Sequence, residues 1–494
     1  MSTLGEVVQL FMDGRDEDAR RACRKLLKAE PALPQAHLLL AEISRKLGDE
    51  GTARDELART LRLQPGWTEA HAHAAIADLF MEHRRYDDAE PGYRRALALS
   101  PALHEAREQL LRMLLAQHRY DELEAASREA MALFPDAAFY PERLGIAHWR
   151  RGRYEEGLAA FRIAVERAPG PASEAHLSAR LHLANALLML GRLGEGWVEY
   201  QWRHTRVARH SQHPELLDQP ASVAANATPR RIRIVAEQGF GDDLFFLRFA
   251  PALRRRGHEL AMSCDDKLAP LLSRMPQVLQ HVNPRDFVPD ITLCSGDLPL
   301  ASGEDMAPPL PLPVDAARRA RWAARLQAFG PPPYIGVSWR AGILPQDVQP
   351  TQGAYWVKDV SPERLGQTLR GLDVRVVVLQ RRPAGEDLAA FRHGLGRGAL
   401  DLSEVNDDLQ DALAVLSLLD DYVGVSNTNV HLRVGIPGAG ARVLVRTPTE
   451  WRWSGGPESS RWFPGVRVYR DVPGQDWAAA LAALEGDLRG VFAA

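Results

Sequence analysis

The sequence predicts a mixed fold of class α plus α/β, in which an N-terminal α-helical solenoid precedes two α/β lobes with parallel sheets. Three observations support this fold class. Prolines recur at nearly constant spacing over roughly the first 200 residues. From residue 231 onwards, short apolar runs alternate with helix-like stretches, which is the pattern of βαβ units. A proline-rich stretch, Met306–Pro313, divides this second region in two.

Length and composition indicate several folded units and exclude some classes of partner. At about 150 residues per domain, a chain of 494 residues is expected to form about three units. Hydrophobic residues make up 45% and charged residues 25%, as in ordinary globular proteins. The net charge of -3 gives no overall attraction to nucleic acid or to an anionic membrane. Any anionic ligand must therefore be bound by a local site.

The cysteine content and the absence of targeting patterns predict a cytoplasmic protein. The three cysteines, Cys23, Cys264 and Cys294, are far apart and lack CxxC spacing, so neither a disulfide framework nor a cysteine zinc site is expected. No signal-peptide pattern and no run of about 18 apolar residues occurs, so no membrane span is expected. Since no His, Asp or Glu set has metal-ligand spacing, we expect no metal cofactor.

The N-terminal region consists of repeats. The prolines are separated by steps of 34, 36, 34 and 34 residues, and each interval contains one expected turn position. The period resembles that of the tetratricopeptide repeat, in which two antiparallel helices pack together and the proline follows the second helix. We expect five repeats and an irregular capping unit within residues 1–204. The prolines are Pro31, Pro65, Pro101, Pro135 and Pro169, and the expected turns are at Gly14, Gly48, His83, His118 and Gly152.

A stack of such repeats has a concave groove that suits a peptide or a partner protein. Protein binding is therefore the functional prediction for residues 1–204. The alternative is that the solenoid serves only as a spacer or as a dimer scaffold.

The region after the solenoid divides into a linker and two lobes. The small and polar run "ASVAANATPR" predicts a linker over residues 205–230. The N-terminal lobe is expected at 231–313 and the C-terminal lobe at 314–494. Expected strands of the first lobe are 231–238, 258–264 and 288–295, with helices at 244–257 and 267–275. Expected strands of the second lobe are 334–339, 374–380, 421–426 and 441–446, with helices at 361–372, 406–419 and 428–436.

Five ordered blocks carry a family resemblance over residues 231–475. They are "EQGFGDDLFFLRFAPAL", "GVSWRAG", "VVVLQ", "DYVGVSNTNVHLRVGIPGAGARVLV" and "EWRWSGG" with "RWFPGVRVYRD". Together they resemble the C-terminal region of bacterial tetratricopeptide-containing glycosyltransferase-like proteins, a region similar to the heptosyltransferase family (glycosyltransferase family 9). The resemblance implies two Rossmann-like lobes in the GT-B arrangement, with the ligand between the carboxyl ends of the two sets of strands.

The loop "AEQGFGDD" is the candidate acceptor side of the site. Its GxG spacing lacks both the third glycine and an acidic residue about 20 positions later, so it does not match the dinucleotide-binding fingerprint. In the heptosyltransferase pattern, the aspartate after this glycine is the proposed general base, and the resemblance assigns that role to Asp242. The alternative is that Asp242 or Asp243 caps the helix.

A polar loop in the second lobe is the candidate donor side. Ser426, Asn427, Thr428 and Asn429 follow a strand and begin a helix, where hydroxyl, amide and backbone donors suit a diphosphate without a metal. Related families bind phosphate at the corresponding loop, with a histidine two or three residues later, here His431. The sequence departs from the family by having Ser-Asn-Thr for the usual Asp-Thr-Ser. The alternative is an ordinary polar helix cap.

Other residues of the second lobe complete the predicted donor site. Arg340 and Lys358 are candidate cations for a leaving diphosphate, because family members carry basic residues in these blocks. Gln380 is a candidate contact to the base or ribose, although a polar strand end that faces solvent explains it equally well. The aromatic residues of "EWRW", with Trp462 and Phe463, suit either a wall beside the ligand or, as we prefer, packing between parts of the protein.

The resemblance implies a metal-independent glycosyltransferase of the hexosyl- or heptosyltransferase kind. It would move a sugar from a nucleotide-sugar donor to an acceptor, and the repeat groove suggests a protein or peptide as that acceptor. The alternative is a non-catalytic interaction scaffold with a degenerate glycosyltransferase domain, which the altered Ser-Asn-Thr block favours.

Overall fold

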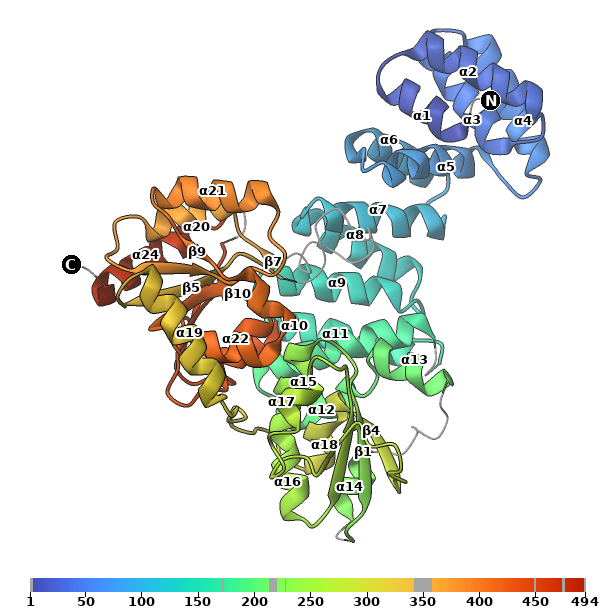
Figure 1. The fold of residues 1–494 in the computed structure, drawn as a ribbon. Helices are drawn as coiled ribbons and strands as arrows, with labels where there is room; N and C mark the ends of the chain where they lie inside the picture. The colour runs from blue at the N-terminus through green and yellow to red at the C-terminus, as the bar shows by residue number, and fades with distance from the viewer. Residues whose placement is uncertain are drawn as a thin grey trace. The chain divides into compact units, whose positions relative to one another are not determined.

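A computed structural model describes residues 3–170, 173–212, 220–226, 228–341, 358–447, 450–472 and 476–492. They form two compact units, Met1–Ala168 and Pro169–Ala494 (Figure 1). In the described part of the chain, no helix is both long enough and apolar enough to cross a membrane.

The first unit is a stack of antiparallel helix pairs. Helices α1 and α2, α3 and α4, α5 and α6, α7 and α8, and α9 and α10 pack in consecutive pairs, which confirms the predicted repeats. Their bounds are α1 Leu4–Met12, α2 Asp16–Ala29, α3 Pro34–Lys46, α4 Glu50–Leu63, α5 Glu69–Glu82, α6 Tyr86–Leu99, α7 His104–Ala116, α8 Tyr120–Leu133, α9 Phe139–Arg150 and α10 Tyr154–Arg167. Each predicted proline follows the second helix of its pair at a constant distance, as Pro31 follows the end of α2 at Ala29.

The turns inside the repeats follow the same spacing as the prolines. Each turn contains one residue with positive φ, and in the third repeat this residue is Arg84 and not the predicted His83. His83 has φ -94° and ends α5, so the chain reverses one residue later. With Arg84 as the third turn residue, the turn residues are separated by the same numbers of residues as the prolines. They are Gly14, Gly48, Arg84, His118 and Gly152.

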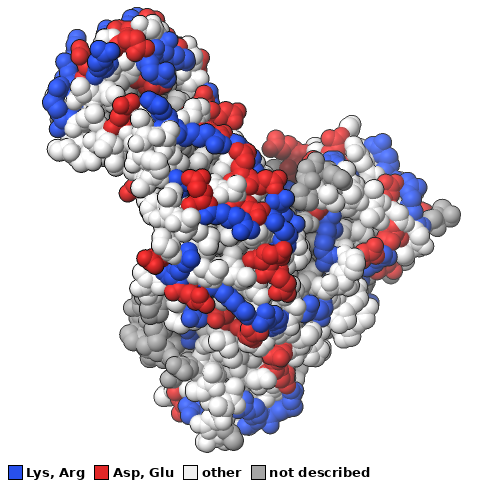
Figure 2. Space-filling view, turned by 180° about the vertical axis from the view of Figure 1, so that it is seen from behind, with Lys and Arg blue, Asp and Glu red and all other residues white. Residues whose placement is uncertain are grey.

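Acidic and basic side chains are interleaved on the surface that faces the viewer in Figure 2. Within the repeats, ion pairs join neighbouring helix pairs. Arg94 lies 3.0 Å from Glu122, and Arg151 lies 3.0 Å from Glu124. Because both signs alternate, this face has no broad patch of one charge, in agreement with the small net charge.

The second unit begins with helices α11 (Glu174–Leu190) and α12 (Leu193–Tyr200), which turn at Gly191 with φ +84°. The predicted boundary at residue 204 therefore lies inside this unit. Part of the expected linker, 205–230, is helical, because α13 covers His204–Gln212 and α14 covers Pro220–Ala225.

The first lobe is a four-stranded parallel sheet in the order β3-β2-β1-β4. Its strands are β1 Arg231–Val235, β2 Glu259–Ser263, β3 His281–Val282 and β4 Ile291–Cys294. Its helices are α15 Phe240–Phe246, η2 Leu247–Phe249, α16 Ala250–Arg255, α17 Ala269–Leu272, η3 Ser295–Asp297 and α18 Leu298–Ser302.

The second lobe is a six-stranded parallel sheet in the order β12-β11-β10-β5-β8-β9, so the predicted pair of Rossmann-like lobes is confirmed. Its strands are β5 Tyr334–Ser338, β8 Arg375–Val378, β9 Leu400–Asp401, β10 Asp421–Val425, β11 Ala441–Val445 and β12 Val466–Arg470, with an antiparallel pair β6 Arg340–Ala341 and β7 Lys358–Asp359. Its helices are α19 Ala316–Phe329, α20 Pro362–Leu369, α21 Gly385–Leu395, η7 Ser403–Asp407, α22 Leu409–Leu416, α23 Thr428–Val434, η8 Trp451–Trp453 and α24 Ala478–Phe492.

Aromatic side chains hold the two lobes and the helices before them together. The ring of Trp451 lies 5.4 Å from Trp197 of α12, 5.2 Å from Phe245 of α15 and 5.5 Å from Trp462. All four rings are buried, with Trp451 at 4% exposure. The aromatic residues of "EWRW" therefore pack between parts of the protein, which is the role the sequence favoured for them.

A buried ion triad fixes the loop that follows β1. Arg203, which follows α12, donates hydrogen bonds to Glu237 Oε1 at 2.7 Å and to Asp297 Oδ1 at 2.8 Å. The side chains of Arg203, Glu237 and Asp297 are at most 3% exposed. Because burial of one charge without its partner is costly, the triad specifies where this loop lies against the preceding helices.

Removal of Arg203 is expected to destabilise the second unit strongly. Arg203→Ala leaves the buried carboxylate of Glu237 without a cation and leaves Asp297 with Arg206 alone, so the free energy of unfolding should fall by about 3–5 kcal/mol. Arg255→Ala is the matched control, because the Arg255 side chain is 65% exposed and that of its partner Glu304 is 37% exposed. The control should lose at most about 1 kcal/mol. Urea denaturation of both variants tests this, and equal losses would contradict the role of the triad.

Candidate functional site

The lobes are in close contact at Gly241. This residue lies in the first turn of α15, which packs on α23 of the second lobe. A Cβ atom at position 241 would lie 2.7 Å from Cδ2 of the His431 ring. A larger residue would require the His431 ring to shift, so the second glycine of "GFGDD" serves close packing between the lobes.

Asp242 has two partners. Its Oδ2 accepts a long hydrogen bond of 3.4 Å from the backbone N–H of Gly239, so it does cap α15. Its Oδ1 lies 2.7 Å from Nη2 of Arg452, which belongs to the second lobe. The side chain is 30% exposed, whereas that of Arg452 is 7% exposed. Capping and a place at the junction of the lobes are therefore both properties of the same carboxylate.

The neighbouring Asp243 has a different environment. Its Oδ1 accepts hydrogen bonds from Ser295 Oγ at 2.7 Å and from the backbone N–H of Glu237 at 3.3 Å. The residue is 1% exposed, and burial raises the pKa of its carboxyl group to about 6. Asp243 therefore holds the loop against the sheet from inside, and Asp242 is the carboxylate of the pair that reaches the other lobe.

Ion pairs extend the contact of Asp242 into the second lobe. Nη1 of Arg452 lies 3.8 Å from Oε1 of Glu450, and Nζ of Lys358 donates to Oε2 of Glu450 at 3.0 Å. Ser426 Oγ lies 3.4 Å from the same Oε2. Burial by itself would raise the pKa of Glu450, but the charges of Lys358 and Arg452 outweigh it and lower this pKa to about 2. The described cluster thus alternates in sign from Lys358 through Glu450 and Arg452 to Asp242.

His431 lies beside this cluster. It is 8% exposed, and its ring contacts Phe463 at 5.5 Å between centroids. Burial, followed by the charges of Arg452, Arg248 and Lys358, holds the pKa of His431 well below its usual value. The imidazole is therefore neutral at pH 7, with one nitrogen that donates and one that accepts.

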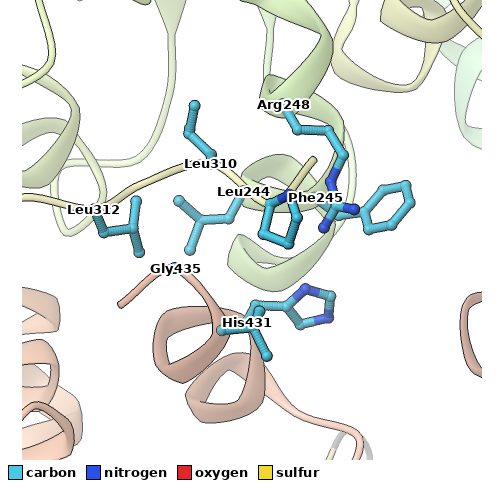
Figure 3. Close-up of a pocket in the computed structure, with 9 residues that line it drawn as sticks. Leu244, Phe245, Arg248, Leu310, Leu312, His431 and Gly435 are labelled. Atoms are coloured by element: carbon cyan, nitrogen blue, oxygen red, sulfur yellow. The ribbon is translucent and has the colours of Figure 1, made fainter. Parts of the chain in front are cut away.

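Figure 3 shows His431 on α23 opposite Phe245 and Arg248 of the first lobe, with Leu310 and Leu312 of the proline-rich stretch to one side. The space between them is large enough for about one water molecule. Arg248 donates to the carbonyl oxygen of Trp462 at 2.9 Å, and its guanidinium lies 4.1 Å from the centre of the Phe245 ring. Burial lowers the pKa of Arg248 to about 9.

Two of the predicted donor residues, Asn427 and Asn429, hold backbone or neighbouring side chains in place. Asn427 accepts from the N–H of Val430 at 3.2 Å and donates to Ser338 Oγ at 2.7 Å. Asn429 donates to the carbonyl oxygen of Leu379 at 3.1 Å. Each of these amides therefore helps to position the loop. Thr428 is half-buried in the first turn of α23.

Gln380 and Arg340 lie outside the ion-pair cluster. The Gln380 side chain is buried, and its Oε1 accepts from the backbone N–H groups of Trp339 at 3.0 Å and Arg340 at 2.9 Å. It therefore supports the backbone after β5. One interpretation of the sequence was a polar strand end that faces solvent, but the Gln380 side chain is buried. Arg340 Nη1 lies 3.2 Å from Asp387 of α21.

Glu450 and Arg452 are site residues that sequence reasoning missed. Both lie in "EWRW", where the two tryptophans drew attention to packing and the two charged residues were passed over. The signal was present, because a charged residue before each tryptophan of a buried segment requires a partner of opposite charge. The partners themselves, Lys358 and Asp242, are far away in the sequence.

No group of three or more His, Cys, Asp or Glu side chains in the described residues is arranged to hold a metal ion. The charged groups of the cluster are instead two cations and two carboxylates. Such an arrangement can hold an anionic group with cationic side chains and present one carboxylate as a proton acceptor.

Comparisons with known proteins find partial similarities. No family model matches the chain. Protein FlbA of Caulobacter vibrioides is 27% identical over 346 residues, which cover 62% of this chain and 54% of that protein. The chain thus spans about half the length of this curated relative.

Similar solved structures fall into two kinds. MamA has 21% identity and a TM-score of 0.22, and the match covers 34% of this chain and 95% of the MamA chain. YrrB, described as a TPR protein with an unusual peptide-binding site, has 18% identity and a TM-score of 0.23 over 36% of this chain and 87% of its own. A glycosyl transferase family 9 protein from Veillonella parvula has 12% identity and a TM-score of 0.37 over 50% of this chain and 88% of its own.

The buried Asp243 should make stability depend on pH. Its folded pKa of about 6 exceeds the ordinary value of 3.8, so the folded state binds the proton more tightly than the unfolded state. Stability contributed by Asp243 is therefore full below about pH 3.8 and is lost as the pH rises to about 6. Asp243→Asn keeps an acceptor oxygen but cannot ionise. The unfolding free energy of the wild type minus that of Asp243→Asn should fall by about 3 kcal/mol between about pH 3.5 and about pH 7. A difference that stays constant over this range contradicts the assignment.

Proposed function

We propose that this protein transfers a sugar from a nucleotide-sugar donor to a hydroxyl group of an acceptor. One observation carries the proposal. Asp242 of the first lobe is joined through Arg452 and Glu450 to Lys358 and Ser426 of the second lobe. Separate sequence blocks had assigned Asp242 to the acceptor side and Lys358 and Ser426 to the donor side. Their convergence at the junction of the lobes supports a single site for both substrates.

In the proposed reaction, the Asp242 carboxylate takes the proton of the acceptor hydroxyl while the hydroxyl oxygen attacks the anomeric carbon of the donor sugar. A new carbon–oxygen bond forms, and the bond between the anomeric carbon and the diphosphate oxygen breaks. The nucleoside diphosphate leaves with the electron pair of that bond. Fixed positive charge near the leaving oxygens stabilises the charge that develops there.

Residues of the second lobe would hold the donor. Lys358 would supply a positive charge for the donor. The Ser426 hydroxyl and the neutral ring of His431 would supply hydrogen-bond donors. Thr428 offers a further hydroxyl in the first turn of α23. Asn427, Asn429 and Gln380 would act by positioning the loops, and Arg340 would reach the donor only by leaving Asp387. The proposal needs no metal ion and no other cofactor.

The repeats would bind the acceptor. A stack of helix pairs presents an extended surface for a peptide, so we propose a protein or peptide acceptor held by the first unit, in the cytoplasm. Binding of a large acceptor at a distance would raise the local concentration of its hydroxyl group at Asp242.

A specific contact favours the rival function of a non-catalytic scaffold. Gly241 packs directly on His431, and Asp242 is paired with Arg452, so the proposed base has a cationic partner already. In an active enzyme the lobes must separate at this contact to admit a sugar. In a scaffold the contact would be permanent.

Ligand-induced stabilisation separates the two functions. A ligand that binds only the folded state raises the thermal midpoint, and at 100 times its Kd the gain is about 2.7 kcal/mol. We expect at least one nucleoside diphosphate or nucleotide sugar to raise the midpoint by several degrees in the presence of a chelator. If a panel covering the common nucleotides and sugars gives no shift at millimolar concentration, the scaffold function is the better account.

Replacement of the proposed base should abolish transfer but not donor binding. Asp242→Asn should reduce kcat by about 100- to 10,000-fold, because the acceptor hydroxyl loses its proton acceptor. The thermal shift with the donor should remain. Asp266→Asn, an exposed aspartate of the same lobe, is the matched control and should transfer at the wild-type rate. Transfer by Asp242→Asn within about threefold of the wild type would leave Asp242 with only its capping role.

A further inference from the structure

Arg452 is a buried cation with unused hydrogen-bonding capacity. The residue is 6% exposed, and its guanidinium lies 4.4 Å from the centre of the Trp451 ring. A guanidinium carries five N–H donors in a rigid fork. Among the described residues, Nε and Nη2 have no aligned acceptor, although Nη2 is 2.7 Å from a carboxylate oxygen of Asp242. The pairing is thus a close charge contact that leaves N–H groups unsatisfied, and such groups are costly when buried.

The position of Arg452 relates it to both halves of the proposed site. Arg452 and Lys358 approach opposite oxygens of the Glu450 carboxylate, at 3.8 Å and 3.0 Å. The two cations therefore lie at the two oxygens of one carboxylate. An arginine fork can bind phosphate oxygens in pairs, and a second cation beside it can neutralise more of the charge of a diphosphate. The cluster has no surplus positive charge while Asp242 and Glu450 neutralise Arg452 and Lys358.

We propose that Arg452 binds the diphosphate of the donor and that it exchanges Asp242 for the diphosphate when the donor binds. The inference rests on the proposed function, because it names the order of events at the same site. Before donor binding, Arg452 holds Asp242 in an ion pair and the lobes in contact. The diphosphate offers Arg452 two charged oxygens in place of one carboxylate contact. Asp242 is then released to accept the proton of the acceptor, so transfer depends on prior donor binding.

Inorganic pyrophosphate is a suitable probe, since it carries the proposed recognition group without base or sugar. In a chelator-containing buffer, Arg452→Met should weaken pyrophosphate binding at least tenfold by isothermal titration calorimetry, and Arg452→Lys should weaken it less because the charge remains. Arg375→Met is the control, because Arg375 begins β8 at the opposite end of that strand from Gln380 and the site. It should bind as the wild type does.

A double-mutant cycle tests the exchange itself. Asp242→Asn should tighten pyrophosphate binding in both arginine backgrounds, because it removes a negative charge. The tightening should be about tenfold greater with Arg452 present than in Arg452→Met. Only when Arg452 is present does Asp242→Asn remove a carboxylate that competes with pyrophosphate for the guanidinium. Equal tightening in both backgrounds would show that Arg452 stays with Asp242, and would overturn the exchange. Circular dichroism and unliganded thermal midpoints establish that each variant is folded. If Arg452→Met is not folded, Arg452→Lys takes its place in the cycle.

Failure of this inference differs from failure of the proposed function. If the wild type binds pyrophosphate and Arg452→Met binds it equally well, Arg452 is not a diphosphate ligand, and the transferase proposal stands on Lys358 and Ser426. If wild-type protein does not bind pyrophosphate at millimolar concentration, the inference is overturned. The screen with nucleotide sugars then decides the transferase proposal independently.

Discussion

The buried contact of Arg203 with Glu237 and Asp297 is the interaction on which the arrangement of the site depends. Arg203 follows the last helix of the α11–α12 pair, and Glu237 lies five residues before Asp242 in the loop after β1. The three charges cannot be separated inside the protein without a large desolvation penalty. They therefore fix the starting point of α15, and with it the direction in which Asp242 leaves the first lobe.

A second set of charges depends on that direction. Because α15 begins where it does, Gly241 meets His431 and Asp242 meets Arg452. The lobe contact consists of an aromatic cluster with a chain of alternating charges at its edge. Aromatic packing gives stability without specifying a ligand, whereas an ion pair with a partly exposed partner such as Asp242 can exchange that partner for an anionic ligand. This combination suits two lobes that hold together and still respond to an anion.

Much of the fold could be predicted because its signals are local. Proline steps and turn positions locate the helix pairs, and alternating apolar runs locate most of the strands. The third turn was assigned to His83 and not to Arg84 because neither residue has the preference for positive φ by which glycine marks three of the other turns. Helix α19 was not predicted, because its four arginines mask a short apolar face that includes Trp322 and Leu326. The helices α13 and α14 fall in a stretch whose small and polar residues suggested only a linker.

The sequence by itself determined the class of fold, the repeats of the first unit, and the polar and charged residues from which the candidate site is built. These properties depend on periodicity and on residue type within one segment. Only the tertiary structure decided which of those residues meet. Lys358 is 92 positions from Glu450, and Asp242 is separated from Arg452 by more than 200. The pairing of Asp242 with Arg452 depends on the packing of α15 against α23, because charges inside a protein are placed by the packing of the elements that carry them and not by their order along the chain.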